Sequence, residues 1–86
     1  MHMSDTATST KITIYGAEWC AFCHTARNYL EGREVDFKYI DVDKDPAKGM
    51  EAVDKSGQRG IPVIDFDGEI IVGFDRPKID AAIAKL

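Results

Sequence analysis

The sequence predicts one α/β domain with elements in the order β-α-β-α-β-β-α, in which helices flank a four-stranded mixed sheet. Three observations support this prediction. The chain has 86 residues, which is enough for a single compact core. Its first half alternates between strand and helix patterns, and its second half contains a hairpin pattern followed by a helix.

The first half of the chain predicts a β-α-β unit. Residues 11–15 are rich in β-branched and aromatic side chains and end at Gly16, which is typical of a buried strand. A helix is expected from Phe22 to near Gly32, because apolar residues recur there with helical spacing. Those residues are Phe22, Cys23, Ala26, Tyr29 and Leu30. Alternating residues from Val35 to Ile40 then predict a strand parallel to the first.

A second helix is expected over residues 46–56. Asp45 is a candidate N-cap, and Pro46 suits the first helical position. The apolar stripe of this helix is thin, with Met50 and Val53 as its expected core contributors.

The last third of the chain predicts a hairpin and a final helix. Asp67-Gly68 supplies the positive φ angles of a tight turn between strands at 62–66 and 69–72. After this hairpin, Asp75 is a candidate N-cap for the last helix. The apolar face of that helix is expected to consist of Ile79, Ala82, Ile83 and Leu86.

Charge and hydropathy narrow the function classes. The formal net charge of −4 leaves no basic stripe, so neither nucleic acid nor an anionic membrane is expected as a partner. No apolar run approaches the roughly 18 residues of a membrane span, and no secretory signal pattern is present. We therefore expect a soluble, cytoplasmic, monomeric protein. Residues 1–10 are expected to be a disordered N-terminal segment that includes a cloning remnant, and residues 11–86 are expected to form the domain.

Cys20 and Cys23 form a Cys-x-x-Cys motif between the first strand and the first helix. At a helix N-terminus, unpaired backbone N–H groups and the helix dipole stabilise a thiolate, so Cys20 is the expected nucleophile. Cys23 lies one turn further along the same side of the helix, where it can attack a mixed disulfide formed at Cys20. Cys23 is therefore the expected resolving thiol.

A metal site is the alternative interpretation of these cysteines. A zinc or iron–sulfur site would need two further ligands, and only His2 and His24 are additional histidines. We therefore expect no metal or other cofactor within one chain. A module in which two chains each present Cys20 to an iron–sulfur cluster or metal remains an alternative from another class.

The order of motifs resembles the glutaredoxin family, and the match covers residues 11–86. It includes Cys-x-x-Cys at 20–23, Arg-x-x-Pro at 59–62 and Gly-Phe-Asp at 73–75. Residues 60–64 and 72–75 are similar to a bacterial and archaeal subgroup close to the H-type redoxins. This resemblance implies a thioredoxin-like (glutaredoxin) fold.

The resemblance also implies roles for residues outside the cysteine motif. Pro62 would be a cis-proline that faces the disulfide, and the backbone of Ile61 would pair with an extended thiol substrate. Arg59 and Asp75 fall where the family contacts glutathione.

The residues beside the cysteines suggest further substrate contacts. Phe22 belongs to a small–aromatic pair between the cysteines that is similar to the interior of glutaredoxin motifs, and it is a candidate substrate contact. Trp19 is a candidate substrate platform, although a partly buried aromatic that bounds the loop is the commoner case.

The chain also departs from the family pattern. Many glutaredoxins have a lysine where this chain has Ala17, and Glu18 adds a negative charge beside Cys20. Arg76 stands where the family often has a second acid. These departures predict weak glutathione binding.

The sequence therefore predicts a glutaredoxin-like enzyme that reduces protein disulfides, or mixed disulfides with a low-molecular-weight thiol, by thiol–disulfide exchange. Its electron donor would be glutathione or an equivalent thiol. The alternative within this class is an H-type redoxin, reduced by a thioredoxin reductase, that donates electrons to ribonucleotide reductase.

Overall fold

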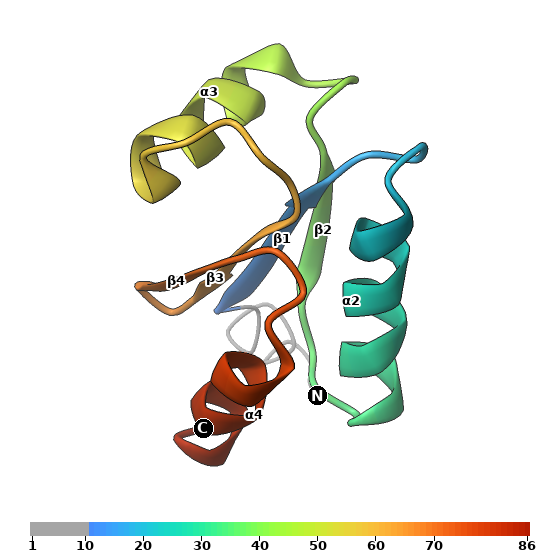
Figure 1. Ribbon diagram of the computed structural model, residues 1–86, viewed down its shortest axis with the longest axis vertical. Coiled ribbons are helices and arrows are strands. Elements are labelled where there is room, and N and C mark those ends of the chain that lie inside the picture. The colour runs from blue at the N-terminus through green and yellow to red at the C-terminus, as the bar shows by residue number, and fades with distance from the viewer. Residues whose placement is uncertain (1–10) are drawn as a thin grey trace, which may run out of the picture.

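Four strands form one mixed sheet at the centre of the molecule (Figure 1). The computed structural model describes residues 11–86, so the predicted disorder of residues 1–10 lies outside the described residues. The strands are β1 (Ile12–Gly16), β2 (Lys38–Asp41), β3 (Val63–Phe66) and β4 (Glu69–Val72), in the sheet order β2-β1-β3-β4. β1 pairs parallel with β2 and antiparallel with β3, and β3 pairs antiparallel with β4. The predicted fold class is confirmed.

Three helices cover the two faces of this sheet. They are α2 (Ala21–Gly32), α3 (Pro46–Ser56) and α4 (Arg76–Ala84). α2 and α4 lie on one face and α3 lies on the other (Figure 1). Within residues 11–86, no helix has both the length and the apolar character needed to cross a membrane.

Alternation along β1 divides the core into two layers. Ile12 and Ile14 face α2 and α4, whereas Tyr15 faces α3. The larger layer contains the buried residues Ile12, Ile14, Ala26, Leu30, Ile64, Phe66, Ile71, Ile79 and Ala82. The smaller layer contains Tyr15, Ala52 and Val63. The larger layer therefore fixes α2, the helix that carries Cys23 and is capped by Cys20.

The bounds of α3 match the prediction, but the residues that anchor it do not. Met50 is exposed and Val53 is only half-buried, whereas Ala52 is the buried residue of the helix. A methyl group at Gly49 would lie 3.4 Å from Cβ of Val42, in ordinary contact with it. The expectation for Met50 and Val53 was wrong because small residues let this helix approach the sheet closely.

Three further expectations need correction. β2 begins at Lys38 rather than at Val35, because the Val35 N–H still donates to the Leu30 carbonyl at 3.0 Å as part of the turn that ends α2. Phe22 is exposed in the first turn of α2 instead of joining the apolar face. Leu86 is also exposed, since α4 ends at Ala84.

The turn and cap predictions are confirmed. Asp67 and Gly68 have φ angles of 52° and 105°, as a tight hairpin turn requires. Asp45 and Asp75 cap α3 and α4, where their side chains accept the N–H groups of Lys48 and Lys78.

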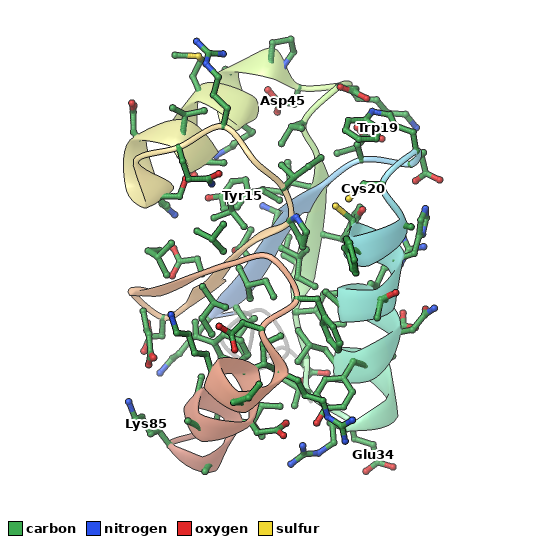
Figure 2. The ribbon with its side chains drawn as sticks, in the orientation of Figure 1. Tyr15, Trp19, Cys20, Glu34, Asp45 and Lys85 are labelled. Atoms are coloured by element: carbon green, nitrogen blue, oxygen red, sulfur yellow. The ribbon has the colours of Figure 1, made fainter. Side chains whose placement is uncertain are left out.

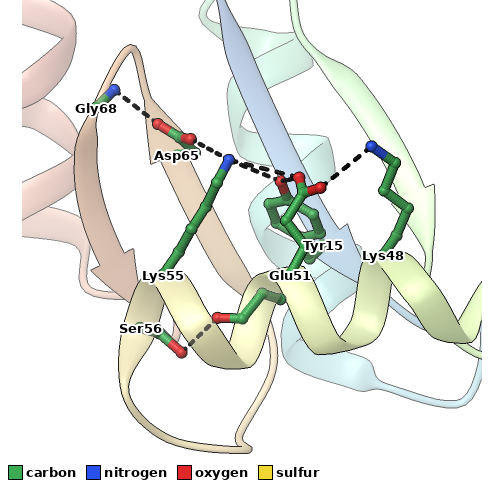
Figure 3. Close-up of polar contacts among 8 residues, drawn as sticks. Tyr15, Lys48, Glu51, Lys55, Ser56, Asp65 and Gly68 are labelled. Atoms are coloured by element: carbon green, nitrogen blue, oxygen red, sulfur yellow. Dashed lines mark hydrogen bonds and ion pairs between the residues drawn. The ribbon is translucent and has the colours of Figure 1, made fainter.

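A polar network joins α3 to the sheet (Figure 3). The buried Tyr15 ring carries its hydroxyl to the edge of α3, where it donates to Glu51 at 2.5 Å and accepts from Lys55 at 2.9 Å. Lys55 also pairs with Asp65 of β3 at 2.7 Å. The hydrogen bond from Tyr15 and the neighbouring Lys48 hold the pKa of Glu51 below its usual value.

This network predicts how acid affects stability. A carboxyl group whose pKa is lower in the folded than in the unfolded chain stabilises the fold above its unfolded pKa, here about 4.5, and loses that contribution as the pH falls through the folded value. We expect Glu51→Gln to lower the urea midpoint at about pH 7 and to have a much smaller effect at about pH 3. Glu31→Gln, at an exposed position of α2, is the control and should leave both midpoints unchanged. Equal losses from Glu51→Gln at both pH values would contradict this account.

Candidate active site

Cys20 is the N-cap of α2 and lies at one end of the sheet (Figure 2). Its backbone is extended, with φ −92° and ψ 109°, and its sulfur accepts the Cys23 N–H at 3.2 Å. The sulfur therefore takes the place that an oxygen holds in most helix caps. The structure thus directs a backbone N–H at the start of a helix toward the Cys20 sulfur.

The loop that leads into β3 closes over this sulfur. The Cys20 thiol donates to the Ile61 carbonyl at 3.9 Å, across a separation of 41 residues. The peptide bond between Ile61 and Pro62 is cis. Pro62 is buried, and its carbonyl accepts the Gly73 N–H at 2.8 Å, which ties the loop to the residue after β4. The predicted neighbours Cys20, Ile61 and Pro62 thus lie together.

Cys23 is fully buried, whereas Cys20 retains 7% of its surface exposed. Burial and a hydrogen bond to Cys20 raise the pKa of the Cys23 thiol to about 12. The Ala17 backbone and the Tyr39 hydroxyl act in the opposite direction. The two thiols are therefore unequal: Cys23 keeps its proton, and Cys20 is the more accessible of the two.

Tyr39 and Gly16 are parts of this site that the sequence did not reveal. A methyl group at Gly16 would lie 2.5 Å from the Tyr39 hydroxyl and 3.0 Å from both Cβ and Sγ of Cys23. The same hydroxyl lies 3.5 Å from the Ala17 carbonyl. The absence of a side chain at Gly16 therefore makes the space in which phenol and thiol meet. Tyr39 was predicted only as a strand residue, and alternation along a strand indicates a face but not a neighbour.

His24 ties the loop before Cys20 to α2. Its Nε2 donates to the Glu18 carbonyl at 2.6 Å, and its Nδ1 accepts from Arg27 at 3.0 Å. Because a carbonyl can only accept, this pattern places the proton on Nε2. From the sequence, His24 was considered only as a possible metal ligand, although its spacing of three residues from Arg27 on a helix indicates contact.

Trp19 and Phe22 stand on either side of Cys20 in the chain, and both are exposed. Trp19 is 71% exposed, and its indole N–H donates to Asp43 at 2.7 Å. The expectation that Trp19 is partly buried is therefore wrong. Phe22 is 66% exposed. An exposed, fixed aromatic beside a thiol is suited to contact a substrate.

Arg59 and Asp75, which were assigned to glutathione contacts, and Arg76, which departs from the family pattern, have different surroundings in the structure. The Asp75 carboxylate caps α4 and lies 3.8 Å from the Lys78 ammonium group. The Arg76 guanidinium lies over the Tyr29 ring at 5.0 Å, next to α2. Arg59 is exposed in the loop that leads to Pro62. Only Arg59 of these three has a side chain without a partner among residues 11–86.

Possible metal ligands do not gather in the described part of the chain. Within residues 11–86, no group of three or more His, Cys, Asp or Glu side chains could hold a metal ion.

Comparison with known proteins identifies the family. The glutaredoxin family model matches residues 12–71. The chain belongs to the glutaredoxin family. An uncharacterized glutaredoxin-like 8.6 kDa protein in the rubredoxin operon of Clostridium pasteurianum is 39% identical, over 86% of this chain and 99% of that protein. Glutaredoxin 3 of Escherichia coli is 34% identical, over 74% of this chain and 77% of that protein.

The chain is also similar to a solved structure of a glutaredoxin-like protein. The NrdH-redoxin of Escherichia coli superposes with a TM-score of 0.73 and 34% sequence identity, over 81% of this chain and 91% of that one. That protein is described as having a thioredoxin-like activity profile. The glutaredoxin family and its thioredoxin-like fold are thus both established for this chain.

Crowding at Gly16 yields a prediction for this glutaredoxin-family chain. Gly16→Ala should displace the Tyr39 hydroxyl and the Cys23 side chain, and lower the free energy of unfolding by about 1–3 kcal/mol. Gly32→Ala is the matched control, because a methyl group there has nothing within 4 Å. Urea unfolding of the reduced proteins measures both. A Gly16→Ala protein as stable as Gly32→Ala would show that the space beside Cys23 is not filled as described.

Proposed function

We propose that this chain reduces disulfides by thiol–disulfide exchange, with Cys20 as nucleophile and Cys23 as resolving thiol. The observation that supports this most is the unequal placement of the two sulfurs. Cys20 caps α2, keeps 7% of its surface exposed and accepts a backbone N–H, while Cys23 is completely buried one turn further along. Family membership supports the same class of chemistry.

In the first step, the Cys20 thiolate attacks a substrate disulfide. A bond forms between the Cys20 sulfur and one substrate sulfur, the substrate disulfide breaks, and the other sulfur leaves as a thiolate. The Ile61 backbone beside Cys20 and the exposed ring of Trp19 are the proposed substrate contacts. The exposed side chains of Phe22 and Arg59 complete the proposed contact surface, and the buried Pro62 is proposed to hold the loop that carries Ile61.

In the second step, Cys23 loses its proton and its sulfur bonds to that of Cys20. The bond from Cys20 to the substrate breaks, and the substrate leaves as a thiolate that takes up a proton. The products are a reduced substrate and an intramolecular disulfide between Cys20 and Cys23. An external thiol or a reductase must then supply two electrons to restore both thiols.

We further propose that the electron donor is a flavoprotein disulfide reductase of the thioredoxin reductase type, as in an H-type redoxin. Two observations favour this over glutathione. Ala17 is buried and Glu18 is exposed beside Cys20, so neither of these two positions supplies a cation for the carboxylates of glutathione. Asp75 and Arg76 are engaged with their own neighbours. The similarity to the NrdH-redoxin of Escherichia coli supports the same choice.

The roles of the cysteines can be separated by substitution. Cys20→Ser should abolish disulfide reduction, whereas Cys23→Ser should accumulate a mixed disulfide on Cys20, detectable by mass spectrometry. In the reduced wild-type protein, iodoacetamide should label Cys20 before Cys23, because Cys23 is buried and its pKa is raised to about 12. Faster labelling of Cys23 would reverse the assignment.

The electron donor can be tested with NADPH and two reducing systems. We expect the oxidised protein to be reduced faster by thioredoxin reductase than by glutathione with glutathione reductase. Glu18→Gln removes the negative charge beside Cys20 and should raise the glutathione rate by about two- to fivefold.

Glu31→Gln is the control for this experiment, since it removes the same charge at the other end of α2 and should change neither rate. Efficient reduction by glutathione alone would instead place this chain with glutathione-dependent glutaredoxins.

A further inference from the structure

The second step of exchange requires a charge on a thiol that the structure buries. Cys23 has no exposed surface, and its pKa is raised to about 12, first by burial and then by its hydrogen bond to Cys20. Once Cys20 is bonded to substrate it carries no charge, so its effect on Cys23 is lost but the effect of burial remains. A hydrogen-bond donor beside Cys23 is therefore needed to stabilise the thiolate form of Cys23.

We propose that the Tyr39 hydroxyl is this donor, and that it stabilises the Cys23 thiolate during resolution of the mixed disulfide. The proposal rests on the proposed function, because it assigns a role within the second step of that reaction. Resolution itself balances without a further reactant. Cys23 gives up a proton, its sulfur displaces the substrate thiolate from Cys20, and the proton passes to solvent or to the leaving thiolate.

The phenol oxygen of Tyr39 and the sulfur of Cys23 both lie close to Gly16 at the end of β1. Both lie against the position that a side chain of Gly16 would fill, at 2.5 Å for the oxygen and 3.0 Å for the sulfur. Tyr39 packs against the cluster formed by Ala17, Cys20 and Cys23. In the reduced protein its hydroxyl is 3.5 Å from the Ala17 carbonyl, a long bond that can be exchanged for one to a thiolate.

Tyr39 is suited to donate rather than to accept. Burial and the nearby Cys23 raise the pKa of its phenol to about 12, so the phenol keeps its proton near neutral pH. The Arg27 guanidinium lies over the Tyr39 ring at 4.7 Å and donates a hydrogen bond to Nδ1 of His24. This packing fixes the ring from the side of α2.

Other titratable groups surround this pair and bear on its pH dependence. The groups that act on or face Tyr39 are Cys20, Cys23, His24 and Arg27 from α2 and its cap, Glu18 from the preceding loop, and Glu31, Glu34 and Asp36, which line a groove with Tyr39. Of these, only Cys20 and Cys23 exchange electrons in the proposed reaction. A change in the titration of Cys23 itself is therefore the decisive measurement.

The kinetic test uses an aromatic disulfide that releases the coloured thionitrobenzoate anion. Attack by Cys20 releases the first equivalent at a rate that depends on reagent concentration, and resolution by Cys23 releases the second at a rate that does not. Cys23→Ser should show the first phase only, which identifies the second. We expect Tyr39→Phe to leave the first phase unchanged and to slow the second about tenfold, the lower end for loss of a bond to a charged group.

Tyr29→Phe is the matched control. It removes a hydroxyl that also bonds a neighbouring group, Asp80, but at the other end of α2. Both phases should keep their wild-type rates in this variant. If wild-type protein shows no first phase at all, the proposed function fails. If the first phase is normal and Tyr39→Phe resolves at the wild-type rate, only the role of Tyr39 is overturned.

A titration separates stabilisation of the thiolate from a merely structural effect. In Cys20→Ser protein labelled with ¹³C at cysteine Cβ, the chemical shift of Cys23 reports its ionisation. Adding Tyr39→Phe should raise the pKa of Cys23 by about one unit, the equivalent of the tenfold slower rate, whereas Tyr29→Phe should not move it. An unchanged pKa, or an equal slowing of both kinetic phases by Tyr39→Phe, would overturn the proposal.

Discussion

The hydrogen bond from the Cys23 N–H to the Cys20 sulfur is the contact on which this site depends. It begins α2, and it also lets the helix stabilise negative charge on the sulfur, so the helix start and the thiolate support each other. Whatever holds α2 in place therefore also holds the nucleophile. Ala26 and Leu30, both buried in the larger core layer, provide that anchorage one and two turns away from the thiols.

Burial makes the two cysteines chemically different. In the proposed reaction, the hydrogen bond between the Cys23 thiol and Cys20 favours the protonated form of Cys23, so the proposed nucleophile and resolving thiol do not compete. Burial opposes the proposed reaction only in its second step, when the Cys23 thiol must lose its proton. Two groups act in the opposite direction to burial, the Ala17 backbone and the Tyr39 hydroxyl, and they come from the loop after β1 and from β2 rather than from α2.

Features with local causes could be predicted from the sequence. Asp67-Gly68 specifies its own turn, Asp45 and Pro46 specify the start of α3, and Cys20 becomes a cap because a strand pattern gives way to a helix pattern there. These predictions depend only on neighbouring residues, and the structure bears them out.

Features that depend on distant contacts could not be predicted in the same way. Hydrophobicity favours Met50 over Ala52 as an anchor, but the close approach of α3 to the sheet selects the smaller residue. Likewise, the pattern of β2 gives Tyr39 a face without indicating that Gly16 leaves room for its hydroxyl beside Cys23. The Ile61 carbonyl reaches Cys20 only because β3 pairs with β1, and the hairpin pattern in the sequence does not indicate which strand the hairpin joins.

The two layers also separate stability from recognition. Tyr15 and Gly16 are adjacent in β1 and face opposite sides of the sheet. The polar network of Tyr15 therefore forms on the side of α3, whereas Cys23 lies against Gly16 on the side of α2. Neither layer presents its buried groups to a partner. In the proposed reaction, the residues that distinguish a small thiol from a reductase are the exposed Glu18 and Trp19 beside Cys20. Their negative charge and fixed aromatic ring support the proposed reductase, because a protein surface can supply a cation and an apolar contact at once, whereas glutathione is an anionic tripeptide.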